Sequence, residues 1–346
     1  MEASIPKNTP ILVTGATGMV GSYLLRYLIQ DGFTNIRAMK RASSPMDLVA
    51  TVADQVEWVE CDLLDVIGLE EVVQGIDLVY HCAALISFKR SEVPKMMAIN
   101  KEGTANLVNV ALHLGIKKKV YVSSIAAIGR PKNQLVIDED TKWESSPFNS
   151  NYGVSKYLAE QEVWRGSAEG LNVAIVNPAM IIGGGFWDRG PLKMLELVRK
   201  EHGFYPMGAN GFVDVRDVCR FMIHLMESEI NEERYVLSAD SISYQSFLSQ
   251  IAETLGAKIP KRPIRKWIGE VAWRAVAFLN FFTGGDPTVT RESVQVSSLP
   301  CEYKNNKSLT VFEFSYLPLE RSIADMAELY KEAEKLQTKP MYLPLS

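Results

Sequence analysis

The sequence has few cysteines, and their spacing excludes the usual metal-binding and disulfide patterns. Only four are present in 346 residues, Cys61, Cys82, Cys219 and Cys301, and no two of them form a Cys-x-x-Cys pair. Most lie in apolar surroundings, which favours reduced thiols in a hydrophobic core over disulfides. We therefore expect no metal site, and we expect a cytoplasmic protein.

The sequence also lacks any long block of charge of one sign. Its 37 Lys and Arg residues and 41 Asp and Glu residues give a net charge of −4, which argues against nucleic acid as a partner. The first ten residues lack the basic and then apolar pattern of a signal peptide, and the chain has no repeats and no low-complexity tract. What it does have is 47% hydrophobic residues, enough for a substantial core in one elaborated domain or in two lobes.

Apolar strands and helical segments alternate through the first half of the chain. Strands are predicted near 10–14, 35–40, 56–60, 78–83, 119–123 and 172–177, and helices near 19–31, 66–74, 92–114 and 151–165. This alternation predicts an α/β fold, a doubly wound parallel sheet with right-handed crossovers and helices on both faces. Ligands bind such a sheet at the carboxyl ends of its strands.

Beyond about residue 183 the alternation is less regular. The run Gly183-Gly184-Gly185 interrupts it. After this run the pattern predicts a helix near 191–201, a strand over 212–215, a helix to residue 227, a strand over 235–237, and helices near 244–255, 262–282 and 319–334.

A glycine-rich turn joins the first strand to the first helix. It contains Gly15, Thr17, Gly18, Met19 and Val20 and ends at a further glycine, Gly21. Glycines let the backbone approach an anion, while free N–H groups and the positive helix end point toward it, so the turn fits a phosphate. The alternative is a turn that serves only the close packing of helix on strand.

Two further features lie downstream. Tyr152 and Lys156 are four apart in Tyr-Gly-Val-Ser-Lys, and Ser123-Ser124 end another apolar strand. Together with the glycine turn, they resemble the short-chain dehydrogenase/reductase superfamily. The glycine spacing and the chain length resemble its extended branch, the NAD-dependent epimerase/dehydratase superfamily, and within it the dihydroflavonol-4-reductase-like enzymes. The resemblance implies a Rossmann domain over 1–182, with later strands at about 211–240 interleaved, and a mainly substrate-binding, mixed α/β lobe over 183–346.

The resemblance also implies a cofactor site at the ends of several strands. Besides the glycine turn, Tyr152 and Lys156, it includes Asp62, Leu63, Cys82, Ala83, Ala84, Pro178, Ala179 and Ile181. The end of the second strand decides between cofactors, because an acidic residue there binds the ribose hydroxyls of NAD, whereas a basic one accommodates the extra phosphate of NADP. In the family frame this place holds Lys40 and Arg41, which bind phosphate through charge-assisted hydrogen bonds. NADP(H) is therefore favoured over NAD(H), and the alternative is a solvated basic loop.

Tyr152 is the candidate proton donor to a carbonyl oxygen as hydride arrives, or the base in the reverse direction. Its phenol, with an ordinary pKa of about 10, must be made more acidic to act as a base. Lys156 shares its helix face at about 5–6 Å between Cβ atoms, and a cation there favours phenolate. The resemblance implies that Lys156 also binds the nicotinamide ribose and that Ser124, rather than Ser123, hydrogen-bonds the substrate oxygen. We assign His81 no proton-transfer role, because a lone histidine of this kind is more often part of the core.

Departures from the family pattern narrow the reaction. Sugar-nucleotide 4,6-dehydratases carry Thr-Asp-Glu where this chain has Ser124-Ile125-Ala126, so β-elimination lacks its acid and base. We expect an NADP(H)-dependent carbonyl reductase or alcohol dehydrogenase acting on a small, partly apolar molecule. The alternatives are a nucleotide-sugar epimerase or reductase and a catalytically silent NADP-sensing regulator, and the presence of Tyr152 favours catalysis over the regulator. A homodimer is left open.

The segment 267–282 is rich in aromatic residues and follows a basic stretch. Glu270 and Arg274 interrupt it and it is short for a bilayer span, so no membrane-spanning helix is expected. We interpret it as a core or lid helix. An aromatic lid over an apolar substrate and a helix lying on a membrane surface are the alternatives.

Overall fold

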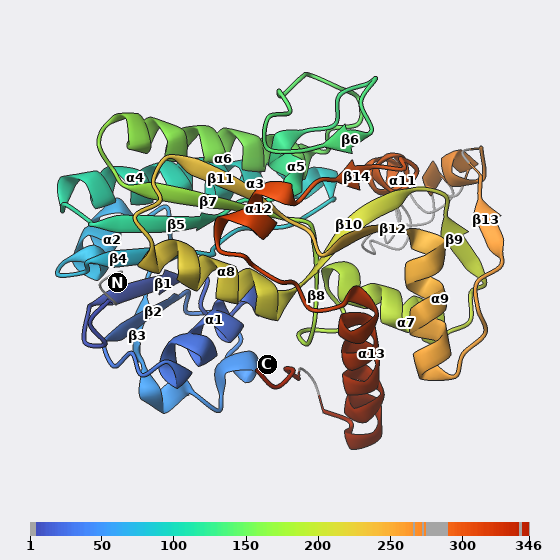
Figure 1. Cartoon of the computed structure of the whole chain (residues 1–346), viewed down its shortest axis with the longest axis horizontal. Coiled ribbons are helices and arrows are strands. Elements are labelled where there is room, and N and C mark those ends of the chain that lie inside the picture. The colour runs from blue at the N-terminus through green and yellow to red at the C-terminus, as the bar shows by residue number, and fades with distance from the viewer. Residues whose placement is uncertain (1–4, 266, 272, 275–289, 339–340, 346) are drawn as a thin grey trace.

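Seven parallel strands form the central sheet of the computed structural model (Figure 1), which describes residues 5–265, 267–271, 273–274, 290–338 and 341–345. In the order in which they pair, they are β11 (Glu233–Leu237), β7 (Val173–Pro178), β5 (Lys118–Val122), β4 (Leu78–His81), β1 (Ile11–Thr14), β2 (Ile36–Lys40) and β3 (Glu57–Glu60). The chain order runs outward from the β1–β4 pair in both directions, so a crevice opens at the carboxyl ends of these two strands. The prediction of a doubly wound parallel sheet is confirmed.

Helices cover both faces of this sheet, as Figure 1 shows. On one face lie α2 (Val66–Val73), α4 (Gly103–His113) and α6 (Asn151–Ala168), and on the other lie α1 (Met19–Gln30) and α8 (Val215–Glu227). Neighbouring residues of a strand point to opposite faces, so Val120 packs in the hydrophobic layer of α1 and α8, and Tyr121 packs in that of α4 and α6. Each central strand therefore needs apolar residues on both faces, which explains its nearly continuous apolar sequence.

The helix expected over 92–114 is one helical run with a wider turn inside it. α3 (Val93–Met97) continues through a π-helical turn (Ala98–Glu102) into α4. Asn100 in this turn accepts the N–H of Leu85 at 2.7 Å and donates to the Leu85 carbonyl and to Ser155 Oγ, both at 2.9 Å. The turn thereby ties the segment after β4 to α6.

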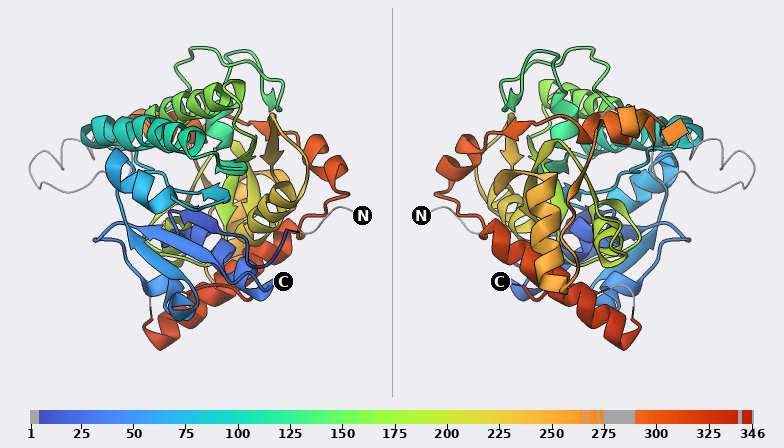
Figure 2. Two further views of the ribbon diagram at one scale, coloured as in Figure 1. Left: turned by 90° about the vertical axis from the view of Figure 1, so that its left-hand side faces the viewer. Right: turned by 90° about the vertical axis from the view of Figure 1, so that its right-hand side faces the viewer.

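The remaining elements are short, and most of them belong to the smaller lobe. The strands form a three-stranded sheet of β12 (Asp240–Ser243), β10 (Ala209–Asp214) and β8 (Met180–Ile182), and the pairs β13 (Arg262–Ile264) with β9 (Phe204–Pro206) and β14 (Glu302–Tyr303) with β6 (Val136–Ile137). The helices are α5 (Ile125–Ile128), α7 (Lys193–Arg199), α9 (Tyr244–Leu255), α11 (Arg291–Ser297), α12 (Asn306–Val311) and α13 (Leu319–Leu336). Figure 2 shows α9 and α13 packed side by side. No helix of the described residues has the length and hydropathy needed to cross a bilayer.

The two strands expected near 211–240 belong to different sheets in the structure. β11 joins the central sheet beside β7, whereas β10 pairs with β8 and β12 in the lobe. Because β11 occupies the outer edge of β7, this edge offers no place to β10. The interleaving of the later chain with the central sheet therefore rests on β11 alone.

The helix expected over 262–282 begins as a strand. Pro263 disfavours helical geometry at the residue before it, and the N–H groups of Lys261 and Arg262 both donate to the Gly203 carbonyl beside β9. Residues 267–271 and 273–274 are helical, and positions 275–282, with Phe278, Phe281 and Phe282, lie outside the described residues. Trp267 and Val271, one turn apart, are 65% and 60% exposed, so this part of the segment is not a core helix.

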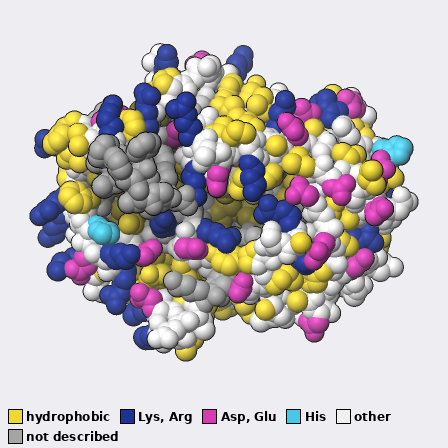
Figure 3. Space-filling model, turned by 180° about the vertical axis from the view of Figure 1, so that it is seen from behind, with side chains coloured by type: hydrophobic (Ala, Val, Ile, Leu, Met, Phe, Trp, Pro, Cys, Tyr) yellow, Lys and Arg dark blue, Asp and Glu magenta, His cyan; other side chains and the backbone are white. Residues whose placement is uncertain are grey.

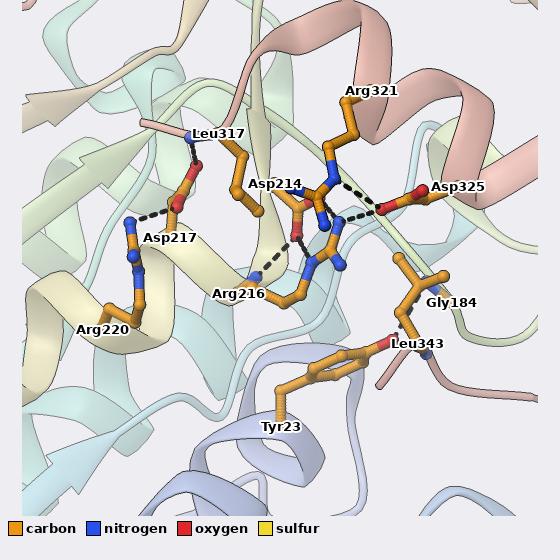
Figure 4. A network of polar contacts seen from close by, with 10 residues as sticks. All are labelled: Tyr23, Gly184, Asp214, Arg216, Asp217, Arg220, Leu317, Arg321, Asp325 and Leu343. Atoms are coloured by element: carbon orange, nitrogen blue, oxygen red, sulfur yellow. Dashed lines mark hydrogen bonds and ion pairs between the residues drawn. The ribbon is translucent and has the colours of Figure 1, made fainter. Parts of the chain in front are cut away.

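A buried polar network fastens α13 to the start of α8 (Figure 4). Arg216 donates through Nε and Nη2 to the two carboxylate oxygens of Asp214, at 3.0 and 2.7 Å, and Nη2 also donates to Asp325 of α13 at 2.8 Å. Asp214 is fully buried and caps α8 by accepting the N–H of Arg216. The protein itself therefore supplies two carboxylates to this buried guanidinium.

The last described residues return to α1, as Figures 1 and 4 show. Tyr23 Oη accepts the N–H of Gly184 at 3.2 Å and that of Leu343 at 2.5 Å. A Cβ on Gly184 would lie 2.7 Å from backbone atoms of Met341 and Tyr342. The glycine run that interrupts the sequence pattern at 183–185 is thus the place where the C-terminal segment crosses the chain.

Candidate active site

The glycine-rich turn between β1 and α1 has the geometry that a closely approaching anion requires. Gly15 has φ +66°, and a Cβ there would lie 2.7 Å from the backbone of Ala83, while a Cβ on Gly21 would lie 2.3 Å from the Gly15 carbonyl. Gly18 is the N-cap of α1, and no side chain caps this helix. The first N–H groups of the helix, which begins at Met19, are therefore free of side-chain caps and can serve an external acceptor.

A buried hydrogen-bond chain lies behind this turn, at the end of β4. Thr14 Oγ1 accepts the N–H of Ala83 at 3.3 Å and pairs with His81 Nδ1 at 2.7 Å, and His81 Nε2 pairs with Thr104 Oγ1 at 3.0 Å. Burial lowers the pKa of His81 well below its ordinary value, so the ring is neutral with both nitrogens bonded. His81 links β1 to α4 and is placed as a structural residue.

The basic pair expected to choose the cofactor lies at the end of β2. Lys40 forms an ion pair with Glu60 on the neighbouring strand β3. Arg41 is exposed, its backbone N–H donates to Ser44 Oγ at 3.0 Å, and no carboxylate of the described residues lies within ion-pair distance of its guanidinium. Of the two cations, Arg41 is the one that receives no counter-charge from the part of the chain that the structure describes.

Ser124 and Tyr152 come from different elements and meet beyond the end of β5. Ser124 is the N-cap of α5, and its Oγ accepts the N–H of Ala126 at 3.1 Å. Tyr152 lies in the first turn of α6, with the ring of Phe88 edge-on at 6.4 Å between centroids. Burial raises the pKa of Tyr152 to about 12, and a hydrogen bond with the Ser124 side chain opposes this rise. The phenol is therefore protonated at neutral pH.

Lys156 is buried one turn further along α6. Its Nζ donates to Tyr121 Oη at 2.7 Å and to the Val122 carbonyl at 2.8 Å. Burial lowers the pKa of Lys156 to about 7, and Glu160 is the main group that opposes this shift. The expected acidifying effect of Lys156 on Tyr152 does not dominate in the structure, because the lysine is hydrogen-bonded to β5 and burial controls the phenol.

Glu160 holds together the layer beneath these residues. Its buried carboxylate accepts Ser123 Oγ at 2.5 Å and Asn177 Nδ2 at 2.8 Å, and it pairs with Arg234 Nη1 at 3.1 Å. Asn177 also donates to the carbonyl of Ser124 at 3.0 Å. Glu160 therefore connects α6 to the ends of β5 and β7. Since Ser123 is committed to this network, Ser124 is the serine left to face a substrate.

The other residues of the expected cofactor site follow the ends of parallel strands. They are Thr17 and Val20 around the first turn, Asp62 and Leu63 after β3, Cys82, Ala83 and Ala84 after β4, and Pro178, Ala179 and Ile181 on or between β7 and β8. Asp62 is exposed and Leu63 is buried against Gly103, where an added Cβ would lie 2.7 Å from Leu63 Cβ. Burial raises the pKa of Cys82 to about 12, so this thiol is inert at neutral pH.

The surface is hollowed between the two halves of the molecule. Figure 3 shows this from behind, with hydrophobic side chains in the hollow and Lys and Arg side chains around it.

Two residues of the layer beneath the site, Tyr121 and Glu160, were not identified from the sequence. The signals were present, since Lys119 and Tyr121 place two polar groups on one face of a buried strand and Glu160 lies one turn after Lys156. Neither signal identifies the partner of the residue.

Comparison with known proteins gives consistent matches along most of the chain. The model of the NAD dependent epimerase/dehydratase family matches residues 11–238. A Synechocystis sp. protein provisionally named dihydroflavonol 4-reductase is 29% identical over 338 residues, which cover 94% of this chain and 96% of that protein. Sterol demethylase protein B of Methylococcus capsulatus is 32% identical over 261 residues, covering 73% and 76%. The crystal structure of gox2253 matches with a TM-score of 0.80 and 28% identity, covering 94% of this chain and 98% of that one.

Proposed function

The chain belongs to the NAD dependent epimerase/dehydratase family, a part of the extended short-chain dehydrogenases/reductases, and from this we propose that it is an NADP(H)-dependent enzyme that reduces a carbonyl group or oxidises the matching alcohol. The observation that carries the proposal is the meeting of Ser124 and a protonated Tyr152 beyond β5, in a chain whose positions 125 and 126 hold no carboxyl group. These two side chains suit proton donation to an oxygen, and the site lacks the acid and base of a dehydratase.

Each polar side chain of the site has a distinct task in this proposal. NADP(H), when bound, supplies or accepts the hydride. Tyr152 holds a proton at neutral pH and delivers it to the carbonyl oxygen, and Ser124 hydrogen-bonds the same oxygen. Lys156 anchors the face of α6 that carries Tyr152, through Tyr121 and the Val122 carbonyl. General acid catalysis of this kind contributes roughly 10²–10⁴-fold to a rate.

The residues around the crevice fit a dinucleotide with a 2′-phosphate. The turn at Gly15 and the uncapped start of α1 suit a pyrophosphate. Arg41 offers an exposed guanidinium at the end of β2 without an ion-pair partner among the described residues, and Lys40 lies beside it with Glu60 as its partner. A phosphate would give Arg41 charge-assisted hydrogen bonds that these residues do not supply.

The substrate in this proposal is a largely apolar ring compound. The support is the hydrophobic hollow in Figure 3 together with the names of two relatives, which refer to a dihydroflavonol and a sterol. Aromatic or alicyclic ketones should therefore be reduced more readily than sugar nucleotides.

Two measurements test the proposal. Fluorescence titration compares NADPH with NADH, and NADPH absorbance follows turnover across a panel of aromatic ketones, alicyclic ketones and nucleotide-linked sugars. We expect tighter binding of NADPH and turnover of ring ketones. Turnover restricted to nucleotide-linked sugars would refute the proposal in favour of an epimerase or sugar-nucleotide reductase, and cofactor binding with all carbonyls inert would favour a regulator.

A further inference from the structure

Arg130 is a buried cation without an acidic partner among the described residues. It is 6% exposed, and the ionisable groups close to it are Tyr303, Cys301 and Tyr244. Burial lowers the pKa of Arg130, but these three neighbours together raise it above the ordinary value. Burial in turn raises the pKa values of the neighbours, so they are neutral at pH 7 and the guanidinium remains charged and unmatched.

An unmatched buried charge is costly, and a fold keeps one where something else supplies the counter-charge. Beside Arg130 lies the buried hydroxyl of Tyr303, which completes no hydrogen bond of ordinary geometry among the described residues. Its oxygen and the Cys301 sulfur are within reach of the guanidinium as acceptors. A guanidinium has five N–H donors and a phenol has one, so these two acceptors leave donors of the pair unused, and an oxyanion would satisfy them.

The position of Arg130 ties this pair to the reaction centre. Arg130 follows Gly129, which ends α5 with φ +91°, and its backbone N–H donates to Asn149 Oδ1 at 2.8 Å. Asn149 directly precedes the N-cap of α6. Arg130 is therefore fixed between the helix that Ser124 caps and the helix that carries Tyr152.

The position of Tyr303 ties the pair to the cofactor side as well. Gly211 of β10 lies between Tyr303 and Ala179, since a Cβ on this glycine would be 3.2 Å from Tyr303 Cδ2 and 3.0 Å from Ala179 Cβ. Ala179 belongs to the cofactor site that the family resemblance implies. The donor pair thus stands where the lobe borders the proposed hydride-transfer site.

We propose that Arg130 and Tyr303 form a subsite for a carboxylate carried by the substrate, which makes the substrate a largely apolar carbonyl compound with an acidic group. A guanidinium binds a carboxylate through two parallel hydrogen bonds, and the Tyr303 hydroxyl supplies a third. The assignment of the carbonyl rests on the proposed function, whereas the binding of the carboxylate does not. A phosphate ester presents similar oxygens, and the experiment separates it from a carboxylate.

The test measures the thermal stability of the full chain with NADP⁺ present, at constant ionic strength, against increasing benzoate, benzamide or phenyl phosphate. We expect benzoate to raise the Tm and its uncharged isostere benzamide to leave it unchanged. Arg130→Met should weaken benzoate binding at least tenfold, and without benzoate it should melt at the same or a higher temperature, because it removes an unmatched charge. The matched control is Arg262→Met, which changes an exposed arginine of the smaller lobe and should bind benzoate as the unmodified chain does.

The proposal is overturned if benzoate fails to bind the unmodified chain, if Arg130→Met binds it equally well, or if Arg130→Met melts at a clearly lower temperature, as the loss of a structural arginine would require. Tighter binding of phenyl phosphate than of benzoate would replace the carboxylate by a phosphate and overturn it too. If Arg130→Met does not fold, Arg130→Lys keeps the charge without the planar fork and should show the same loss of benzoate binding. Reduction of neutral ketones without benzoate binding would refute this subsite alone, and benzoate binding without any carbonyl turnover would refute the proposed function alone.

Discussion

Two of the buried arginines, Arg216 and Arg130, have opposite surroundings. Arg216, on the side where the C-terminal segment meets α1, is held by Asp214 and Asp325 (Figure 4). Arg130, on the side where the lobe borders the proposed reaction centre, has Tyr303, Cys301 and Tyr244 as its ionisable neighbours and no carboxylate among the described residues. The counter-charge of Arg216 comes from the protein, and in our proposal that of Arg130 comes from a ligand. This proposal assigns stability to the first side and binding and chemistry to the second.

The largest effect is expected on the reaction side, from Tyr152→Phe. This change removes the proton donor and almost no volume, so kcat should fall by roughly 10²–10⁴-fold while the Tm and the affinity for NADPH stay nearly unchanged. Steady-state rates, a cofactor titration and a melting curve provide the three readouts.

Tyr157→Phe is the matched control for this variant. Tyr157 lies on the same helix and stacks on Trp143 at 4.1 Å, a contact that phenylalanine retains. Its rate should equal that of the unmodified chain. A Tyr152→Phe enzyme with most of its activity would remove Tyr152 from the mechanism and with it the contrast between the two sides.

The second effect is expected on the opposite side, from Arg216→Met. It leaves Asp214 and Asp325 without their partner, and breaking such a buried pair lowers the free energy of unfolding by about 3–5 kcal/mol. Denaturant unfolding measures the loss. Arg321→Met is the control, because Arg321 is 62% exposed and lies 3.9 Å from Asp325, a surface contact of little worth. Equal losses in the two variants would contradict the role given to Arg216.

The third effect sharpens the contrast at the cofactor end of the crevice. Replacing Lys40 and Arg41 together by alanine should weaken NADPH binding by about 1–3 kcal/mol for each lost bond to a charged group, and NADH binding should hardly change. Arg41→Ala alone should account for most of the loss, because Lys40 already has Glu60 as its partner. Equal affinities of the unmodified chain for NADPH and NADH would contradict the assignment of both residues.

The smallest effect concerns pH and a third buried cation, Lys119. Its Nζ has no hydrogen-bond partner among the described residues, and burial lowers the pKa of Lys119 to about 7. Between pH 7 and about 10 the unfolded chain binds more protons than the folded chain at this group, so stability should rise with pH in this window. Lys118 and Lys156, whose pKa values burial also lowers, act in the same direction.

Lys119→Met tests this sign. The variant should melt about 1–2 °C higher at pH 7, which corresponds to roughly 1 kcal/mol for a chain of this size. The gain should shrink toward pH 9, where the lysine of the unmodified chain is neutral in the folded state. A gain that is independent of pH would show that packing, rather than the charge, is responsible.

The central sheet was predictable from the sequence because its signals are local. Apolar strands, the glycine turn and the helical spacing after it each occupy a few consecutive residues, and the parallel sheet follows from their alternation. The prediction of a helix over 262–282 is wrong in its first residues, because the contact that determines their structure is not local. The backbone N–H groups of Lys261 and Arg262 donate to the Gly203 carbonyl, and the sequence around residue 262 does not indicate that β9 is the partner strand.

The site was predictable in position and less so in energetics. The places of Ser124, Tyr152 and Lys156 at the ends of β5 and on α6 follow from motif spacing. The pKa of Tyr152 does not, because it depends on how much water the fold removes from the phenol. The surroundings of Arg130 could not be predicted from the sequence either. They depend on Tyr303 and Tyr244, which come from distant segments and lie near Arg130 only in the folded chain.

The contact between Tyr23 and Leu343 has a consequence for how the chain is made. The hydroxyl on α1, the helix that follows the phosphate turn, receives the backbone N–H of a residue 320 positions later. A ribosome releases Tyr23 long before Leu343, so α1 cannot complete this contact until the segment around Leu343 has emerged. Contacts of such high sequence separation slow folding and leave early segments exposed meanwhile. During synthesis, the side of α1 that carries Tyr23 therefore stays without this contact until that segment has been made.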